Sequence, residues 1–111
     1  MELVKDKIYH EKETGLAWLC LGEDEMPRET GVVLALPQFK ENSKKPLRFD
    51  VYLTPKENLE IEGNETISIK DKKQGFSFVE SPVDCFGIIN PTYDEISGRY
   101  KKAIKHYEQT P

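Results

Sequence analysis

Cysteine and histidine, the usual zinc ligands and frequent catalytic groups, are scarce in this sequence. It has two cysteines, Cys20 and Cys85, and two histidines, His10 and His106. None of the four has a partner at the short spacing that zinc sites use, so we expect no metal ion and no cofactor. A phosphate-binding glycine loop, a nucleophile elbow and a zinc-binding helix motif are missing as well. We therefore predict a protein without enzymatic activity.

Long apolar segments are also missing. The longest apolar run, Leu16 to Leu21, is too short to cross a bilayer. Met1 is followed by charged residues at positions 2, 5, 6 and 7, unlike the basic and apolar regions of a secretory signal. We expect a cytoplasmic protein without membrane contact, whose two cysteines are reduced and buried. A disulfide between Cys20 and Cys85 stays open as an alternative.

Basic residues are fewer than acidic ones. Twenty aspartates and glutamates against sixteen lysines and arginines give a net charge of −4. Proteins that bind nucleic acid without sequence preference gain affinity from clustered lysines and arginines, so this balance argues against that class. A basic protein is the better match for the charge, and we expect such a partner.

Repeats and linkers are absent, which indicates one domain over residues 1–111. The polar stretch from Gln38 to Pro46 is short enough to be an ordinary loop. Two runs, Leu16–Leu21 and Val32–Leu36, are apolar at odd and even positions alike, so they predict central strands that are buried on both faces. We expect the second face to be covered by curling of the sheet. The N-terminal segment and a second copy of the protein, in a homodimer, are the alternatives.

A hairpin is predicted over residues 59–69, and its register can be worked out. A two-residue turn at Gly63-Asn64 would leave Ile67 on the wrong face of the sheet. A three-residue loop over Gly63–Glu65 instead pairs Ile61 with Ile67 and keeps both in the core. We predict the longer loop.

A helix is predicted at the C-terminal end. Thr92 and Glu95 have the spacing of a capping box, in which each side chain satisfies a free backbone amide. The apolar residues that follow share one face: Tyr93, Ile96, Tyr100, Ala103, Ile104 and Tyr107. The chain therefore predicts an α+β fold. Its parts are a strongly curved antiparallel sheet, or a small partly open barrel, of five to seven strands, with one C-terminal amphipathic helix packed on it.

The loop between the two central strands carries four carboxylates and one arginine. The simplest interpretation is that these charges keep the end of a hairpin solvated. As a functional site the loop would contact a basic protein, together with a tyrosine on the polar side of the alternating strand over residues 47–54. The predicted partner-binding residues are Glu23, Asp24, Glu25, Arg28, Glu29 and Tyr52.

Our leading hypothesis is a small acidic binding module that acts by protein contact as an inhibitor, adaptor or subunit, with phage or host-defence antagonism as one setting. The first alternative is a nucleic-acid contact through the basic side of the C-terminal helix. Its residues are Arg99, Lys101, Lys102 and Lys105, which are equally compatible with a plain solvated surface. The second alternative is an enzyme with a dispersed site, built from Cys85, Asp84 and either histidine.

Overall fold

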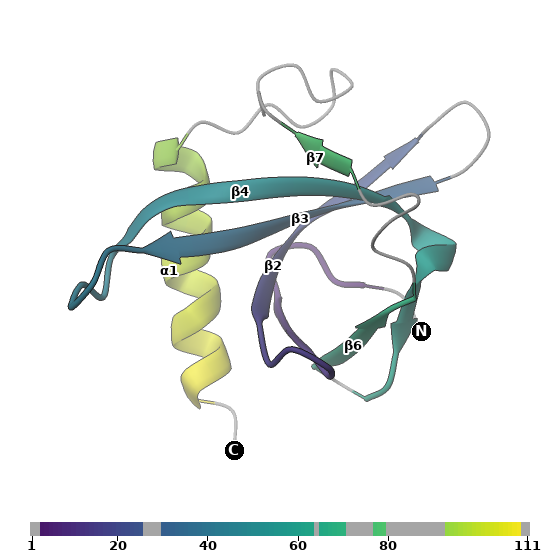
Figure 1. Ribbon diagram of the computed structural model, residues 1–111, viewed down its shortest axis with the longest axis horizontal. Helices are drawn as coiled ribbons and strands as arrows, with labels where there is room; N and C mark the ends of the chain where they lie inside the picture. The colour runs from purple at the N-terminus through teal and green to yellow at the C-terminus, as the bar shows by residue number, and fades with distance from the viewer. Residues whose placement is uncertain (1–2, 26–29, 64, 71–76, 80–92, 110–111) are drawn as a thin grey trace.

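The computed structural model describes residues 3–25, 30–63, 65–70, 77–79 and 93–109. They form a sheet with one long helix against it (Figure 1). The strands are β1 Ile8–Glu11, β2 Ala17–Glu25, β3 Thr30–Phe39, β4 Pro46–Pro55, β5 Leu59–Ile61, β6 Thr66–Ile69 and β7 Ser77–Val79. The short 3-10 helix η1 (Lys56–Asn58) follows β4, and α1 spans Tyr93–Gln109. The prediction of an α+β fold with one C-terminal helix is confirmed.

The strands form one mixed sheet in the order β5-β6-β1-β2-β3-β4-β7. Neighbouring strands are antiparallel except β1 and β6, so the prediction of a purely antiparallel sheet is wrong at this junction. After β4 the chain runs through η1 and β5 to the opposite edge of the sheet. There β6 pairs with β1, and the two strands run in the same direction. There the amide of His10 donates a hydrogen bond to the carbonyl of Glu65 at 2.6 Å. In the described chain β5 and β7 are the two edges, so the sheet is not closed into a barrel.

Apolar side chains of the central strands lie on both faces of the sheet, as predicted. The helix-side core joins the sheet to α1, and its buried members are Ile8, Leu19, Leu21, Val33, Ala35, Val51, Leu53, Ile96, Tyr100 and Ala103. The second core lies on the opposite face, and its buried members are Tyr9, Trp18, Cys20, Val32, Leu34, Ile67 and Ile69. Because β2 and β3 contribute to both cores, they hold the two halves of the molecule together.

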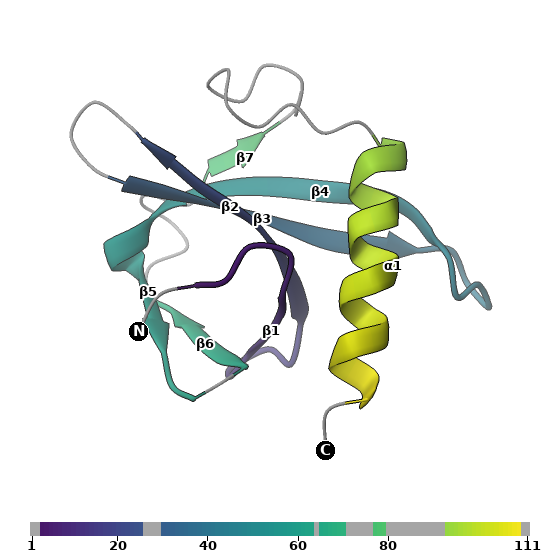
Figure 2. The same cartoon turned by 180° about the vertical axis from the view of Figure 1, so that it is seen from behind.

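The second core is covered from within the chain. Ile67 and Ile69 of β6 pack against residues of β2 and β3, and Leu3 of the N-terminal segment packs against the same cluster. Figures 1 and 2 show β1, β6 and β5 turned out of the plane of β3 and β4, over this face. The strands and the N-terminal segment therefore both contribute to the cover, and the homodimer stays open as an alternative.

β4 is buried more fully than its alternating pattern predicts. Thr54 is 0% exposed. Tyr52 is half-buried, with its ring edge-on to that of Trp18 at a centroid distance of 5.5 Å. The prediction of a polar face is wrong at this end of β4, because the curled half of the sheet packs against it.

Two predictions that rest on neighbouring residues are confirmed. In the β5–β6 hairpin Ile61 lies opposite Ile67, which is the register of the three-residue loop. The apolar side of α1 faces the sheet, where Ile96 and Tyr100 are buried. Thr92, the predicted capping residue, lies outside the described residues.

Candidate functional site

The acidic residues predicted to bind a partner are only partly described by the structure. Glu23 lies in β2, and its Oε1 is 2.8 Å from Nζ of Lys56. Tyr52 lies on the same face of the sheet but packs against Trp18 in the second core. The backbones of Asp24 and Glu25 end β2, whereas Arg28 and Glu29 lie outside the described residues. Glu23 and Tyr52 are thus each engaged within the chain.

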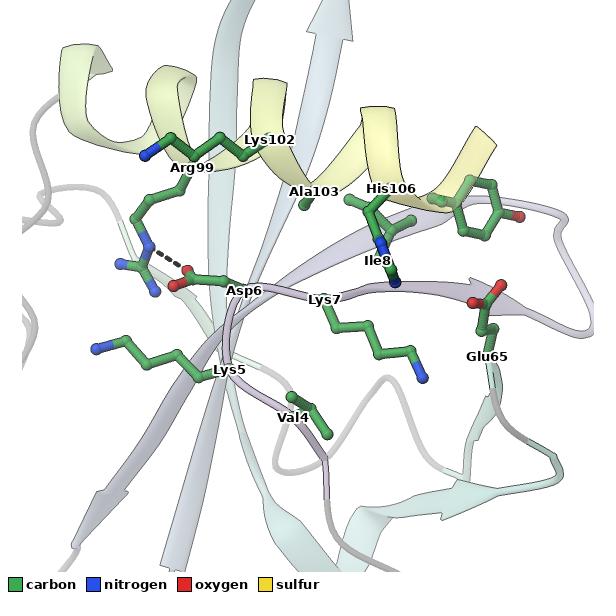
Figure 3. Close-up of a pocket in the computed structure, with 11 residues that line it drawn as sticks. Val4, Lys5, Asp6, Lys7, Ile8, Glu65, Arg99, Lys102, Ala103 and His106 are labelled. Atoms are coloured by element: carbon green, nitrogen blue, oxygen red, sulfur yellow. Dashed lines mark hydrogen bonds and ion pairs between the residues drawn. The ribbon is translucent and has the colours of Figure 1, made fainter. Parts of the chain in front are cut away.

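Arg99, one of the four basic helix residues, holds α1 to the sheet. Its Nε contacts the carboxylate of Asp6, as Figure 3 shows, and its Nη2 donates a hydrogen bond to the carbonyl of Leu21 at 2.7 Å. The amide of Asp6 in turn donates to the carbonyl of Cys20 at 2.8 Å. With a side chain only 16% exposed, Arg99 therefore joins the helix, the N-terminal segment and β2. It is a structural residue rather than a free contact.

The N-terminal cavity lies between residues 4–8 and α1, next to Arg99, and has a volume of about 330 Å³ (Figure 3). The ionisable residues that line it include Lys5, Asp6, Lys7, Glu65, Lys102 and His106. Two carboxylates share this space with the basic groups, and Nζ of Lys7 lies 5.4 Å from the ring centroid of Tyr9. The positive charge of the N-terminal cavity is therefore partly balanced by residues that line the same cavity.

The hairpin cavity lies on the other side of α1, against the loop between β3 and β4. Its volume is about 450 Å³. It is lined by Lys44, Lys45, Pro46, Ser97, Gly98, Tyr100, Lys101 and Ile104. No carboxylate of the described residues is among these, so the positive charge of its three lysines is not balanced within the cavity. An adjoining hollow shares Lys45 and Pro46 with it and extends to Tyr93.

Six exposed lysines lie at the two cavities and on the exposed side of α1, and we call them the lysine surface. Its members are Lys5, Lys44, Lys45, Lys101, Lys102 and Lys105. Lys101 borders the hairpin cavity, Lys102 borders the N-terminal cavity, and Lys105 follows both by about one helical turn. None of the six forms an ion pair with another residue that the structure describes. That Lys44 and Lys45 belong to this surface was not predicted from the sequence, because they lie in a stretch that has the composition of an ordinary polar loop.

The candidates for nucleophilic chemistry do not come together in the described chain. Cys20 is a free, buried thiol in the second core, and burial raises its pKa to about 11, so it is protonated at neutral pH. His10 lies in β1 and His106 on α1. Cys85 and Asp84, on which the enzyme alternative depends, lie outside the described residues.

Neither a metal site, nor a membrane-spanning helix, nor a known relative indicates a function for the described chain. Within the described ranges, no three histidine, cysteine, aspartate or glutamate side chains are grouped so that they could hold a metal ion. The described part of the chain contains no helix with the length and apolar character needed to span a membrane. Comparison with protein-family models, with curated proteins and with solved structures finds no match for this chain.

Proposed function

We propose that this protein is a non-catalytic binding module that contacts nucleic acid through the lysine surface. The observation that supports this proposal is the gathering of six exposed lysines from three separate segments, without ion pairs to described residues. Each lysine that reaches a phosphate releases a condensed counterion, which is the main source of affinity in such contacts. The geometry thus favours the contact that overall composition disfavours.

The net charge of −4 does not prevent this contact, because the charges are distributed unevenly. Two of the acidic residues away from α1 are paired with bases, Glu23 with Lys56 and Glu62 with Lys12 at 3.3 Å. Asp50 pairs with Arg48 at 3.2 Å. At physiological salt the Debye length is about 8 Å, so a phosphate near α1 responds to the lysines around it more than to distant acids.

Charge reversal tests the proposal. The triple variant Lys101→Glu, Lys102→Glu and Lys105→Glu should abolish the salt-dependent binding of a fluorescent oligonucleotide, measured by anisotropy at low salt. Its control reverses Lys12, Lys56 and Lys70, which lie off the lysine surface, and so changes the net charge by the same amount. We expect the control to bind within about threefold of the wild type, since these three lysines lie off the lysine surface and two of them, Lys12 and Lys56, already pair with carboxylates.

Two results would contradict the proposal. One is a wild-type protein that gives no anisotropy change at low salt with either a single strand or a duplex. The other is an equal loss of binding in the two triple variants, because net charge alone would then explain the effect. A linear fall of the logarithm of the wild-type affinity with the logarithm of the salt concentration supports the proposal.

A second candidate is contact between the acidic β2–β3 hairpin and a basic protein. It is favoured by the position of the end of β2 and the start of β3, which lie on the side of the sheet away from α1 (Figures 1 and 2). Affinity capture should then return a basic partner, and binding should weaken with added salt and with Glu23→Lys. A partner that is indifferent to both changes would exclude this candidate.

A further inference from the structure

The hairpin cavity has the chemistry of a site for an anionic group. Lys44 and Lys45 on the β3–β4 loop and Lys101 on α1 border the same space, together with Ser97. The N-terminal cavity, in contrast, contains two carboxylates. Because lysine ammonium groups donate hydrogen bonds and carry positive charge, the hairpin cavity suits a phosphate better than the N-terminal cavity does.

Gly98 leaves open space on α1 at the hairpin cavity. It lies inside the helix and lines the hairpin cavity, yet a Cβ atom at this position would meet nothing within 4 Å. Packing within the described chain therefore does not require a glycine, although glycine is one of the poorest residues for a helix interior. A close approach of a ligand to the helix backbone accounts for it, because any side chain would occupy that space.

Tyr93 supplies a fixed aromatic surface beside the cavity. Its hydroxyl donates a hydrogen bond to the carbonyl of Pro46 at 2.5 Å, and its ring lies 5.8 Å from that of Phe49 between centroids. The side chain is nevertheless 38% exposed. The adjoining hollow, of about 340 Å³, extends from Lys45 and Pro46 to Tyr93 and to Leu47, which is 61% exposed. The lysine-lined cavity and a partly exposed tyrosine, held in place through its hydroxyl, are thus neighbours.

We propose that the hairpin cavity binds one backbone phosphate of a single-stranded nucleic acid, and that the exposed part of Tyr93 stacks on a base of the same strand. The inference rests on the proposed function and specifies its substrate class. A single strand is favoured over a duplex because its bases are unpaired and free to stack on an aromatic side chain. Such stacking tolerates any base, so no sequence preference is required.

Matched lysine pairs separate this site from general attraction to the lysine surface. Lys44→Ala with Lys45→Ala removes two charges from the hairpin cavity, and Lys5→Ala with Lys102→Ala removes two from the N-terminal cavity. With a labelled 12-nucleotide deoxythymidine strand, we expect the first pair to lose at least about tenfold in affinity and the second about threefold. Equal losses would overturn the assignment to the hairpin cavity while leaving the nucleic-acid contact in place.

Two single substitutions test the phosphate approach and the stacking. Gly98→Ala should raise the Tm by about 4 °C, which shows that the variant folds, and should still lower the ratio of single-strand to duplex affinity. Tyr93→Leu should weaken single-strand binding by about tenfold. An unchanged ratio in Gly98→Ala, or unchanged single-strand affinity in Tyr93→Leu, would overturn the inference.

Two outcomes concern the ligand class. If the wild type binds neither oligonucleotide but binds vesicles that contain phosphatidylserine, both the inference and the proposed function are wrong, because the lysines then serve a membrane surface. If the wild type prefers the duplex over the single strand, the inference alone is wrong. A preference for the single strand that disappears in the Lys44 and Lys45 double variant supports it.

Discussion

Glu11 is an acidic residue that is buried beside the second core. It is 1% exposed, and its Oε1 accepts a hydrogen bond from Nε1 of Trp18 at 2.9 Å. Glu11→Ala should lower the free energy of unfolding by about 2 to 4 kcal/mol, because the indole N–H loses its partner and a cavity is left. Glu11→Gln keeps an acceptor and should cost less. Urea denaturation measures both, with exposed Glu60→Ala as a control expected within about 0.5 kcal/mol of the wild type.

Cys20 gives a prediction about alkaline pH. Burial raises the pKa of its thiol from the ordinary 9.0 to about 11. Because the folded pKa lies above the unfolded value, its contribution to stability is complete below pH 9 and is lost as the pH rises through 11. The difference in unfolding free energy between wild type and Cys20→Ala should therefore shrink by about 2 kcal/mol between pH 8 and pH 11. A difference that stays constant across this range would contradict the assignment.

At the scale of elements, the contact of Arg99 with Asp6 and Leu21 fastens α1 to the sheet. Arg99→Ala should lower the free energy of unfolding by about 1 to 3 kcal/mol, because the buried carbonyl of Leu21 and the Asp6 carboxylate both lose a charged donor. Hydrogen exchange should also become faster along α1. Lys105→Ala, on the exposed side of the same helix, serves as the control and should change stability by less than about 0.5 kcal/mol.

The elements that sequence predicts well are those set by neighbouring residues. The α1 face and the pairing of Ile61 with Ile67 follow from periodicity and loop length alone. The parallel pairing of β1 with β6 depends on where the chain returns after η1, and no local pattern encodes that path. The burial of Thr54 also depends on the path of the chain after β4, since Nδ2 of Asn58 in η1 donates a hydrogen bond to its hydroxyl at 2.9 Å.

The candidate site was predicted only in part, for a related reason. Periodicity placed Lys101, Lys102 and Lys105 on the exposed side of a helix, and all three are exposed in the structure. Lys44 and Lys45 lie more than fifty residues earlier in the sequence, in a loop that gives no sign of facing that helix. Only the fold brings the two segments to the same cavity.

For the whole molecule, the cover of the second core bears on its state of association. Leu34, Cys20 and Ile67 in this core are 0% exposed in a single chain. A homodimer is therefore not needed to bury the second face of β2 and β3, and we expect light scattering after size exclusion to give the mass of one chain. A mass of two chains that persists on dilution would show that a different surface, such as that around exposed Leu47 and Phe39, mediates assembly.

The two outermost strands of the sheet, β5 and β7, are only three residues long each. A longer unpaired strand would offer a row of free amides and carbonyls on which a neighbouring molecule could add a strand of its own. β5 and β7 themselves offer little such template, but β7 pairs with only Val51, Tyr52 and Leu53 of the ten residues of β4. In the described chain the rest of this edge of β4 has no partner strand, and amyloid-type strand addition would be expected to begin there.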